Sequence, residues 1–304
     1  MRLLGIVLSV LLFCQPASAQ EKLKVIASFS VLADIVGQIG GERVAVRTLV
    51  PAMGDAHVFQ PSPSDARAVA GADLLVSNGL NFETWLDRLI AASGYKGHRV
   101  VAAEGIRPRR MARHRHDHGG GHDDDAGAVE DPHVWQDLQR MPAYIANIAE
   151  GLAAADPPHA EHYRARGRAY IDELRMLDAW AEAQLAAVPE VRRRAITQHD
   201  AFGYLADRYG ITFYTAQGMT TEAEASAGGI AELLRQIRRN RVRAIFLESG
   251  LNQRLIEQVA KDAGAKVGGR LYSDTLSPPG GEADSYIRMY RLNITRLAEA
   301  MRLD

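Results

Sequence analysis

The chain has 304 residues, and its 36 basic and 37 acidic residues leave a formal net charge of −1. This balance gives no reason to expect a nucleic acid or an anionic membrane surface as a partner. The single cysteine excludes a disulfide within the chain and a metal site built from several thiolates. The composition is that of an ordinary globular protein, and the length is enough for two domains of ordinary size.

The N-terminus carries the pattern of a secretory signal peptide. Arg2 precedes an apolar run at 3–13, and the small residues Ala17-Ser18-Ala19 follow. This order predicts a signal peptide over residues 1–19 with an A-x-A cleavage site. The apolar run is too short to span a bilayer, which takes about 20 apolar residues. Cys14 leaves a lipoprotein signal as an alternative, although the bulky Phe13 before it fits lipoprotein processing badly. We therefore expect an exported protein of the periplasm.

Strand-like and helical patterns alternate in both halves of the mature chain. In the first half we expect strands at 23–27, 44–50, 74–77 and 99–101, with helices at 31–39, 64–70 and 82–92. In the second half we expect strands at 195–197, 211–215 and 243–247, with helices at 202–209, 225–239, 253–263 and 283–302. Such alternation predicts an α/β fold of two lobes, residues 20–155 and 189–304, each a mostly parallel sheet flanked by helices.

One long helical pattern lies between the two lobes. Pro157-Pro158 open it, Pro189 ends it, and the residues at helical spacing within it are Tyr163, Tyr170, Leu174, Leu177 and Leu185. About 30 residues at ~1.5 Å each make a rod of roughly 45 Å. We expect residues 156–188 to form one long rigid helix that joins the lobes.

Residues 109–130 break the alternation, because this stretch has almost no apolar residues. It contains His114, His116, His118 and His122 among arginines, glycines and aspartates. Such a stretch cannot bury enough surface to hold a fold, so we expect a mobile loop. The histidines favour a secondary metal loop of low affinity, and a solvated linker with incidental histidines is the alternative.

Four turn-rich segments, at 53–63, 131–137, 198–204 and 271–274, each place a histidine or an aspartate beside an expected strand or helix end. These residues are His57, His133, His199 and Asp274. In open α/β sheets ligands bind beyond the carboxyl ends of the strands, where such loops lie. Three imidazoles and one carboxylate suit the four-ligand shell of zinc. Each histidine alone is weak support for a site, but the four residues together predict a zinc centre.

Several neighbours of these residues could support the centre. Asp55, Asp131, Asp137 and Asp200 could accept a hydrogen bond from the second ring nitrogen of a ligating histidine. Their alternative role is to cap turns or helices. We expect Trp135 and Phe59 to be walls of the site or part of the core.

The segments 54–65, 131–137 and 199–204 resemble the signatures of the zinc and manganese solute-binding proteins of ABC transporters, and the resemblance covers residues 23–303. It implies two α/β lobes bridged by one long helix. It also implies that His57, His133, His199 and Asp274 are the metal ligands. The expected partner is the permease of an ABC importer in the inner membrane, to which a monomer delivers Zn²⁺. A periplasmic metallochaperone stays open as the metal donor.

The third ligand position bears on which metal is bound. Manganese-preferring members of this family tend to have a carboxylate there, and this chain has His199. Imidazole suits zinc, whereas a set richer in oxygen suits manganese. We therefore expect zinc, with a manganese-preferring member as the alternative.

Two other functions compete with metal delivery. A secreted zinc-dependent hydrolase needs an open coordination position for water, which four protein ligands would fill. The chain also lacks the motifs H-E-x-x-H, G-x-S-x-G and G-x-x-x-x-G-K-[ST], so we do not expect an enzyme. An adhesin or a zinc store without a transporter stays open.

Overall fold

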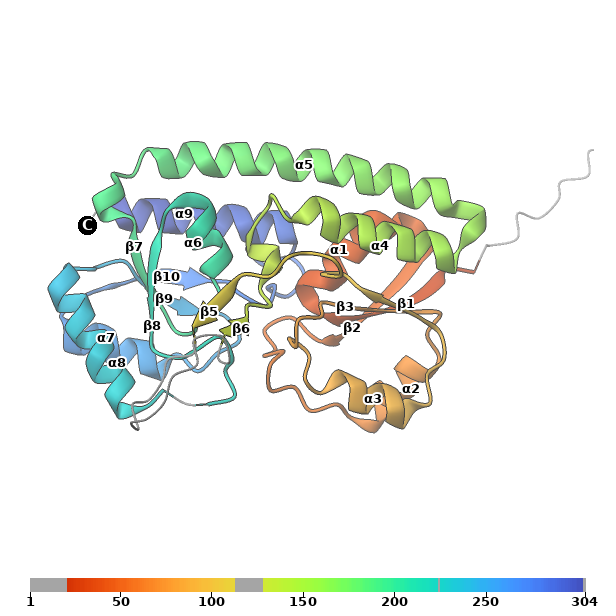
Figure 1. The fold of residues 1–304 in the computed structure, drawn as a ribbon, viewed down its shortest axis with the longest axis horizontal. Helices are drawn as coiled ribbons and strands as arrows, with labels where there is room; N and C mark the ends of the chain where they lie inside the picture. Colours follow the sequence, from red (N-terminus) through yellow and green to blue (C-terminus); the bar gives the residue numbers. More distant parts are fainter. Residues whose placement is uncertain (1–20, 113–127, 224, 303–304) are drawn as a thin grey trace, which may run out of the picture.

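The computed structural model describes residues 21–112, 128–223 and 225–302, which form two α/β halves side by side (Figure 1). The first half contains the strands β1 (Leu23–Phe29), β2 (Val44–Val50), β3 (Leu74–Ser77) and β4 (His98–Val101). They form a parallel sheet in the order β2-β1-β3-β4. All four residues of β3 are buried, as expected of a strand covered by helices on both faces.

Helices cover both faces of this first sheet. The helices α1 (Ser30–Gly40) and α4 (Met141–Ala155) lie on one side, and α2 (Pro63–Ala70) and α3 (Leu86–Ser93) lie on the other (Figure 1). The start of α2 is set locally, because Ser62 and Asp65 form a reciprocal capping box and Pro63 is the first helical residue.

The second half repeats the architecture with its own parallel sheet. Its strands are β7 (Arg194–Thr197), β8 (Thr212–Thr215), β9 (Ile245–Glu248) and β10 (Val267–Leu271), in the order β10-β9-β7-β8. Its helices are α6 (Gly203–Tyr209), α7 (Ala227–Asn240), α8 (Arg254–Ala263) and α9 (Tyr286–Arg302). Short 3-10 helices lie at Gly41–Arg43, Val134–Gln136, Pro157–His159 and Glu190–Arg192.

The helix α5 (Ala160–Ala186) runs along both halves (Figure 1). Its 27 residues span about 40 Å at ~1.5 Å each. It packs on α1 and α4 in the first half and on α9 in the second. A Cβ atom at Gly167 would lie 3.2 Å from the Cβ atom of Ala149, so this glycine allows α5 to approach α4 closely. The long helix is therefore packed against both halves along its length.

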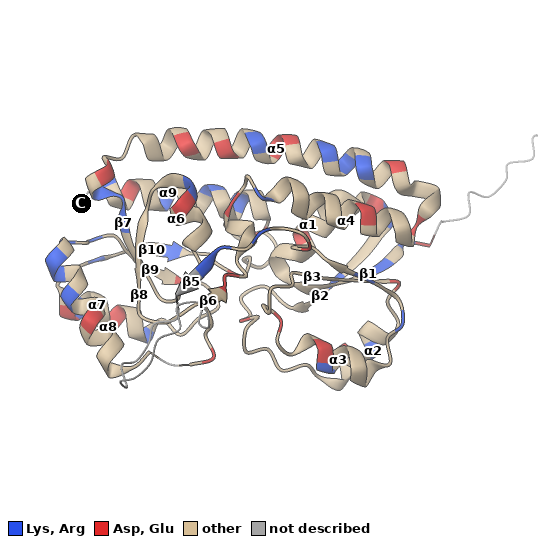
Figure 2. Ribbon diagram, viewed as in Figure 1, with Lys and Arg blue, Asp and Glu red and all other residues tan. Residues whose placement is uncertain are grey.

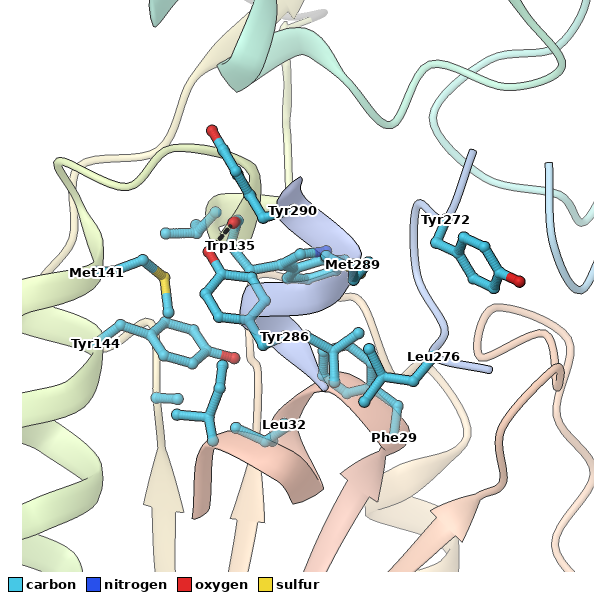
Figure 3. Close-up of a cluster of buried hydrophobic side chains, with 14 of the residues drawn as sticks. Phe29, Leu32, Trp135, Met141, Tyr144, Tyr272, Leu276, Tyr286, Met289 and Tyr290 are labelled. Carbon is cyan, nitrogen blue, oxygen red and sulfur yellow. Dashed lines mark hydrogen bonds between the residues drawn. The ribbon is translucent and has the colours of Figure 1, made fainter. Parts of the chain in front are cut away.

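The main hydrophobic core is continuous across the two halves. Figure 3 shows the part of it where α1, α4 and α9 meet, with these side chains labelled: Phe29, Leu32, Trp135, Met141, Tyr144, Tyr272, Leu276, Tyr286, Met289 and Tyr290. A second, smaller core lies within the C-terminal half, between its sheet and α7 and α8, and includes Ile196, Leu233, Ile237, Ile245 and Ile256. The outer part of the C-terminal half is thus packed separately from the rest.

Charged residues of both signs lie along the exposed side of α5 (Figure 2). They include ion pairs such as Arg164 with Glu150 at 2.7 Å and Arg168 with Glu161 at 2.6 Å. Exposed pairs of this kind stabilise a fold by roughly 0 to 1 kcal/mol. Within the three described ranges, no helix combines the length and the apolar character needed to cross a membrane.

The expected fold class is confirmed, since two parallel sheets flanked by helices are joined by one long helix. Besides the short strands β5 (Arg110–Ala112) and β6 (Ala128–Glu130), the helix α4 and the strand β10 were not predicted. The strand β10 has the sequence Val-Gly-Gly-Arg-Leu, and two glycines give it little intrinsic strand preference. Its pairing with β9 stabilises it instead.

Two expected boundaries need correction. The long helix begins at Ala160, because Pro157–His159 forms a separate 3-10 turn. The expected loop 109–130 is ordered at both ends, where β5 (Arg110–Ala112) pairs antiparallel with β6 (Ala128–Glu130). The backbone hydrogen bonds of this pairing order a stretch that has few apolar side chains to bury. The histidines His114, His116, His118 and His122 lie outside the described residues.

Candidate metal centre

Four loops meet between the two sheets, and each holds one of the residues that the sequence analysis singled out. His57 follows β2, His133 follows β6, His199 follows β7, and Asp274 follows β10. One nitrogen or oxygen atom of each residue lies within 4.8 Å of the corresponding atoms of the other three. The structure thus brings together all four residues of the predicted centre.

The distances between these atoms suit a metal ion. Asp274 Oδ2 lies 3.0 Å from His199 Nε2 and 3.4 Å from His57 Nε2, and Asp274 Oδ1 lies 3.7 Å from His133 Nε2. A tetrahedral zinc ion with bonds of ~2.0 Å would place its ligand atoms roughly 3.3 Å apart. All four residues are buried, with exposed fractions of 0 to 6%.

Buried polar atoms without partners mark the same point. His57 Nε2, His133 Nε2 and Asp274 Oδ1 are buried and make no hydrogen bond. A buried polar group left unpaired costs about 1 to 3 kcal/mol. A divalent cation between the three rings and the carboxylate would satisfy these atoms together, so the residues present fit a metal ion.

Asp131 orients the ring of His133. One carboxylate oxygen, Oδ1, accepts the backbone N–H of His133 at 3.0 Å and lies 2.8 Å from ring Nδ1. Asp131 is fully buried, and Arg109 lies 3.4 Å from its other oxygen. With Nδ1 held by Asp131, Nε2 of His133 faces the cluster. Asp131 therefore has the supporting role that the sequence predicted.

Two other aspartates proposed as ring partners make turn contacts instead. Asp55 accepts the backbone N–H of His57 at 3.0 Å and the hydroxyl of Thr221 at 2.7 Å. Asp137 accepts the backbone N–H of Gln139 at 2.9 Å and an N–H of Arg140 at 3.0 Å. The capping role was thus the correct alternative for both.

Asp200 lies close enough to the centre for His133 and His199 to affect its carboxyl electrostatically. Burial raises the pKa of Asp200, and the negative charge of Asp131 raises it further. Its backbone N–H donates to the carbonyl of Gly218 at 3.0 Å.

Glu248 supports His199, and the sequence analysis missed it. This fully buried residue ends β9, and its Oε1 accepts the backbone N–H groups of Gln198 at 2.5 Å and His199 at 2.9 Å. Its Oε2 lies 2.7 Å from His199 Nδ1, although the two atoms are not aligned for a straight hydrogen bond. The available signal was an acidic residue directly after the expected strand 243–247.

The charges of the cluster shift the proton affinities of its members. Burial by itself lowers the pKa of the His199 imidazole, but the carboxylates of Glu248 and Asp274 outweigh it and raise this pKa well above 6.5. Burial by itself raises the pKa of the Asp274 carboxyl, but His199 and His133 hold it well below 3.8. In the metal-free protein the cluster therefore favours a protonated His199 beside an ionised Asp274.

Aromatic side chains line the centre on one side. The ring of Phe82 stands edge-on to His57 with centroids 4.8 Å apart, and Trp135 meets His133 at 5.3 Å. The prediction that Trp135 forms a wall is confirmed. Phe59 packs on Trp85 at 4.9 Å, as part of the surrounding core. A wall of rings excludes water and so strengthens electrostatic interactions inside the site.

Two α/β halves with a buried centre of three imidazoles and one carboxylate define a protein that holds a metal ion. Known proteins support this class. The chain is 30% identical to the manganese-binding lipoprotein MntA of Halalkalibacterium halodurans, over 90% of this chain and 87% of that protein. It is 29% identical to the manganese ABC transporter substrate-binding lipoprotein PsaA of Streptococcus pneumoniae, over 93% of this chain and 90% of that protein.

A solved structure shares the fold as well. The periplasmic zinc-binding protein TroA of Treponema pallidum superposes with a TM-score of 0.83 at 28% identity, over 92% of this chain and 99% of that one. The chain belongs to the family described as zinc-uptake complex component A, periplasmic, which matches residues 25–300. It is a metal-binding substrate-binding protein of an ABC transporter and not an enzyme. Proteins of this kind are exported and deliver metal to a membrane permease.

Proposed function

We propose that this protein binds Zn²⁺ through His57, His133, His199 and Asp274 and delivers it to an ABC importer. The observation that supports this most is the convergence of three ring nitrogens and one carboxylate on a single buried point. Four donors complete a tetrahedral zinc shell and leave no open position for a reacting water.

Zinc is preferred to manganese on the chemistry of these donors. Manganese favours an octahedral set of oxygen ligands, whereas imidazole suits zinc. The centre offers three imidazoles and a single carboxylate. Two of the relatives above are named for manganese and the neighbour from Treponema pallidum for zinc, so a manganese-preferring protein is the competing function.

Competition between the two metals tests this proposal. We expect the purified metal-free protein to take up one tight equivalent of zinc and to retain it in a large excess of manganese. Replacing His57, His133 or His199 by alanine should cost several kcal/mol of zinc affinity, because each side chain completes the shell. Asp274→Ala should cost less, because a water can replace the carboxylate. Displacement of bound zinc by equimolar manganese would contradict the proposal.

A ligand exchange separates metal preference from general damage. His199→Glu replaces an imidazole by a carboxylate, so the ratio of zinc affinity to manganese affinity should fall. His98→Glu makes the same change at an exposed position on β4 and should leave the ratio unchanged. Equal ratios in the two variants would count against His199 as a metal ligand.

Export is proposed to occur through a signal peptide cleaved after Ala19. The alternative is a lipid anchor on Cys14, and several relatives are named as lipoproteins. The mass of the exported protein distinguishes the two. A chain that begins at Gln20 supports cleavage, and a chain that begins at Cys14 with an added lipid supports the anchor. Size-exclusion measurement on the same sample tests the proposed monomer.

A further inference from the structure

We propose that Glu248 is a positioning residue that holds His199 in the tautomer able to bind metal and that supplies the second negative charge balancing a divalent ion. The inference rests on the proposed metal centre. Glu248 itself is not a ligand in this proposal, because its carboxylate lies on the far side of the His199 ring, at Nδ1.

The contacts of Glu248 converge on the loop that carries His199. Oε1 accepts two successive backbone N–H groups, from Gln198 and His199, and Oε2 lies 2.7 Å from the ring. The carboxylate therefore holds the backbone of His199 by hydrogen bonds and lies at ion-pair distance from the ring of the same residue. Glu248 ends β9, which lies between β10 and β7 in the sheet, so a rigid element carries it.

A carboxylate at this place selects one tautomer of the neutral imidazole. A neutral ring carries one N–H, and an ionised carboxylate can only accept hydrogen bonds. The hydrogen is therefore placed on Nδ1, and the lone pair of Nε2 is left for the metal. Nε2 faces the centre, where in the metal-free protein it donates to Asp274 Oδ2 at 3.0 Å, and a bound metal would take the place of that proton.

The charge of Glu248 also completes the balance of the site. Asp274 and Glu248 lie on opposite sides of His199 and together carry two negative charges. Asp131 lies beside Arg109 at 3.4 Å, and the same guanidinium also pairs with Asp207 at 2.9 Å. The two carboxylates that flank the His199 ring match the charge of one divalent cation, and unbalanced charge is costly in a buried site.

Glu248→Gln isolates this role with little change of shape. The amide oxygen can still accept the N–H groups of Gln198 and His199, which turns the amide NH₂ toward His199 Nδ1. That group donates, so Nδ1 must accept, and the ring hydrogen moves to Nε2 where it blocks the metal. We expect zinc affinity to fall about 10 to 100-fold. Glu248→Asp keeps the negative charge, so its loss of zinc affinity should be smaller.

Glu83→Gln is the matched control. Glu83 is a buried carboxylate that accepts the backbone N–H groups of Asn78 at 2.7 Å and Gly79 at 3.2 Å, together with the hydroxyl of Ser28. It thus repeats the backbone contacts of Glu248 away from the ring of any proposed ligand. The zinc affinity of the Glu83→Gln variant should stay close to that of the unaltered protein.

The experiment combines zinc competition titrations with ¹⁵N NMR of the His199 ring in the metal-free variants. At alkaline pH, where the His199 ring is neutral, the expected spectrum of Glu248→Gln shows an unprotonated Nδ1, and that of the unaltered protein shows a protonated Nδ1. Unchanged zinc affinity in Glu248→Gln, an equal loss in Glu83→Gln, or a protonated Nδ1 in Glu248→Gln would overturn the inference.

Two further outcomes are distinguishable. Failure of the unaltered protein to bind zinc tightly would overturn the proposed function itself, before any variant is compared. If Glu248→Gln does not fold, Glu248→Asp decides, because withdrawing the carboxylate by one methylene should weaken zinc severalfold. Unchanged affinity in that variant would overturn the inference.

Discussion

Trp135 donates a hydrogen bond from indole Nε1 to the carbonyl oxygen of Ser273 at 2.8 Å. The side chain of Gln136 donates to the same oxygen at 2.8 Å. Ser273 directly precedes Asp274, and Trp135 follows His133 by two residues. The segments that carry these two proposed ligands are therefore joined by two hydrogen bonds that do not involve the ligand side chains.

Trp135→Phe should weaken the connection between these two segments. The variant removes one of two donors to Ser273 and leaves a small void in a fully buried position, so the free energy of unfolding should fall by about 1 to 3 kcal/mol. Denaturant unfolding of the metal-free protein measures this change. Trp180→Phe on α5, where the ring is partly exposed beneath Arg291, should cost less. Equal losses of unfolding free energy in the two variants would show that the hydrogen bond from Trp135 to Ser273 adds no specific stability.

Zinc affinity should rise with pH from mildly acidic to neutral conditions. Glu248 and Asp274 outweigh burial and raise the pKa of His199, so this imidazole keeps its proton to a higher pH than a free histidine does. Zinc must displace the proton, and each proton released changes the affinity by about tenfold per pH unit. Competition titrations between pH 5 and pH 8 measure the slope. An affinity that does not change with pH would contradict a centre built from imidazoles.

The free energy of unfolding of the metal-free protein should fall as pH rises above neutral. A folded-state pKa of His199 above 6.5 gives a stabilisation that is complete below 6.5 and is lost as pH rises through the raised value. The lowered pKa of Asp274 gives a stabilisation that is present above 3.8 and is lost as pH falls through the lowered value. Unfolding of the metal-free protein between pH 5 and pH 9 tests this. His199→Ala should remove the loss at high pH.

Replacing residues 113–127 by Asn-Gly should leave the tight zinc site intact. Ala112 and Ala128 are paired in the β5 and β6 ladder, and a two-residue turn of this composition closes such a hairpin. The weaker zinc equivalents predicted for His114, His116, His118 and His122 should disappear. Zinc titration of both proteins checks this. Loss of the tight equivalent would make the segment part of the primary centre.

The metal-free protein should already be folded. Its cores are built from apolar side chains in both halves and do not depend on a metal, unlike the core of a zinc finger. Zinc at 100 times its dissociation constant should add about 2.7 kcal/mol of stability by mass action. Circular dichroism and thermal unfolding measure both effects. A metal-free protein without native secondary structure would refute preformed halves.

The sequence alone was sufficient for the fold class. Apolar strand-like runs and helical patterns predicted seven of the strands and most of the helices, because most of these elements bury apolar side chains. The strand β10 was not predicted, because two of its five residues are glycines and no local pattern separates it from a loop. Its conformation depends on a neighbouring strand.

The sequence also identified the four residues of the candidate centre, since each lies in a turn-rich segment after a strand or before a helix. Tertiary structure alone decided what surrounds them. Glu248 is 49 residues from His199, and Phe82, rather than Phe59, stands against His57. Loops at the ends of strands are marked by local composition, but the partner of a buried ring nitrogen is chosen by which strands lie side by side. That order is a property of the whole fold, and no short segment of the chain encodes it.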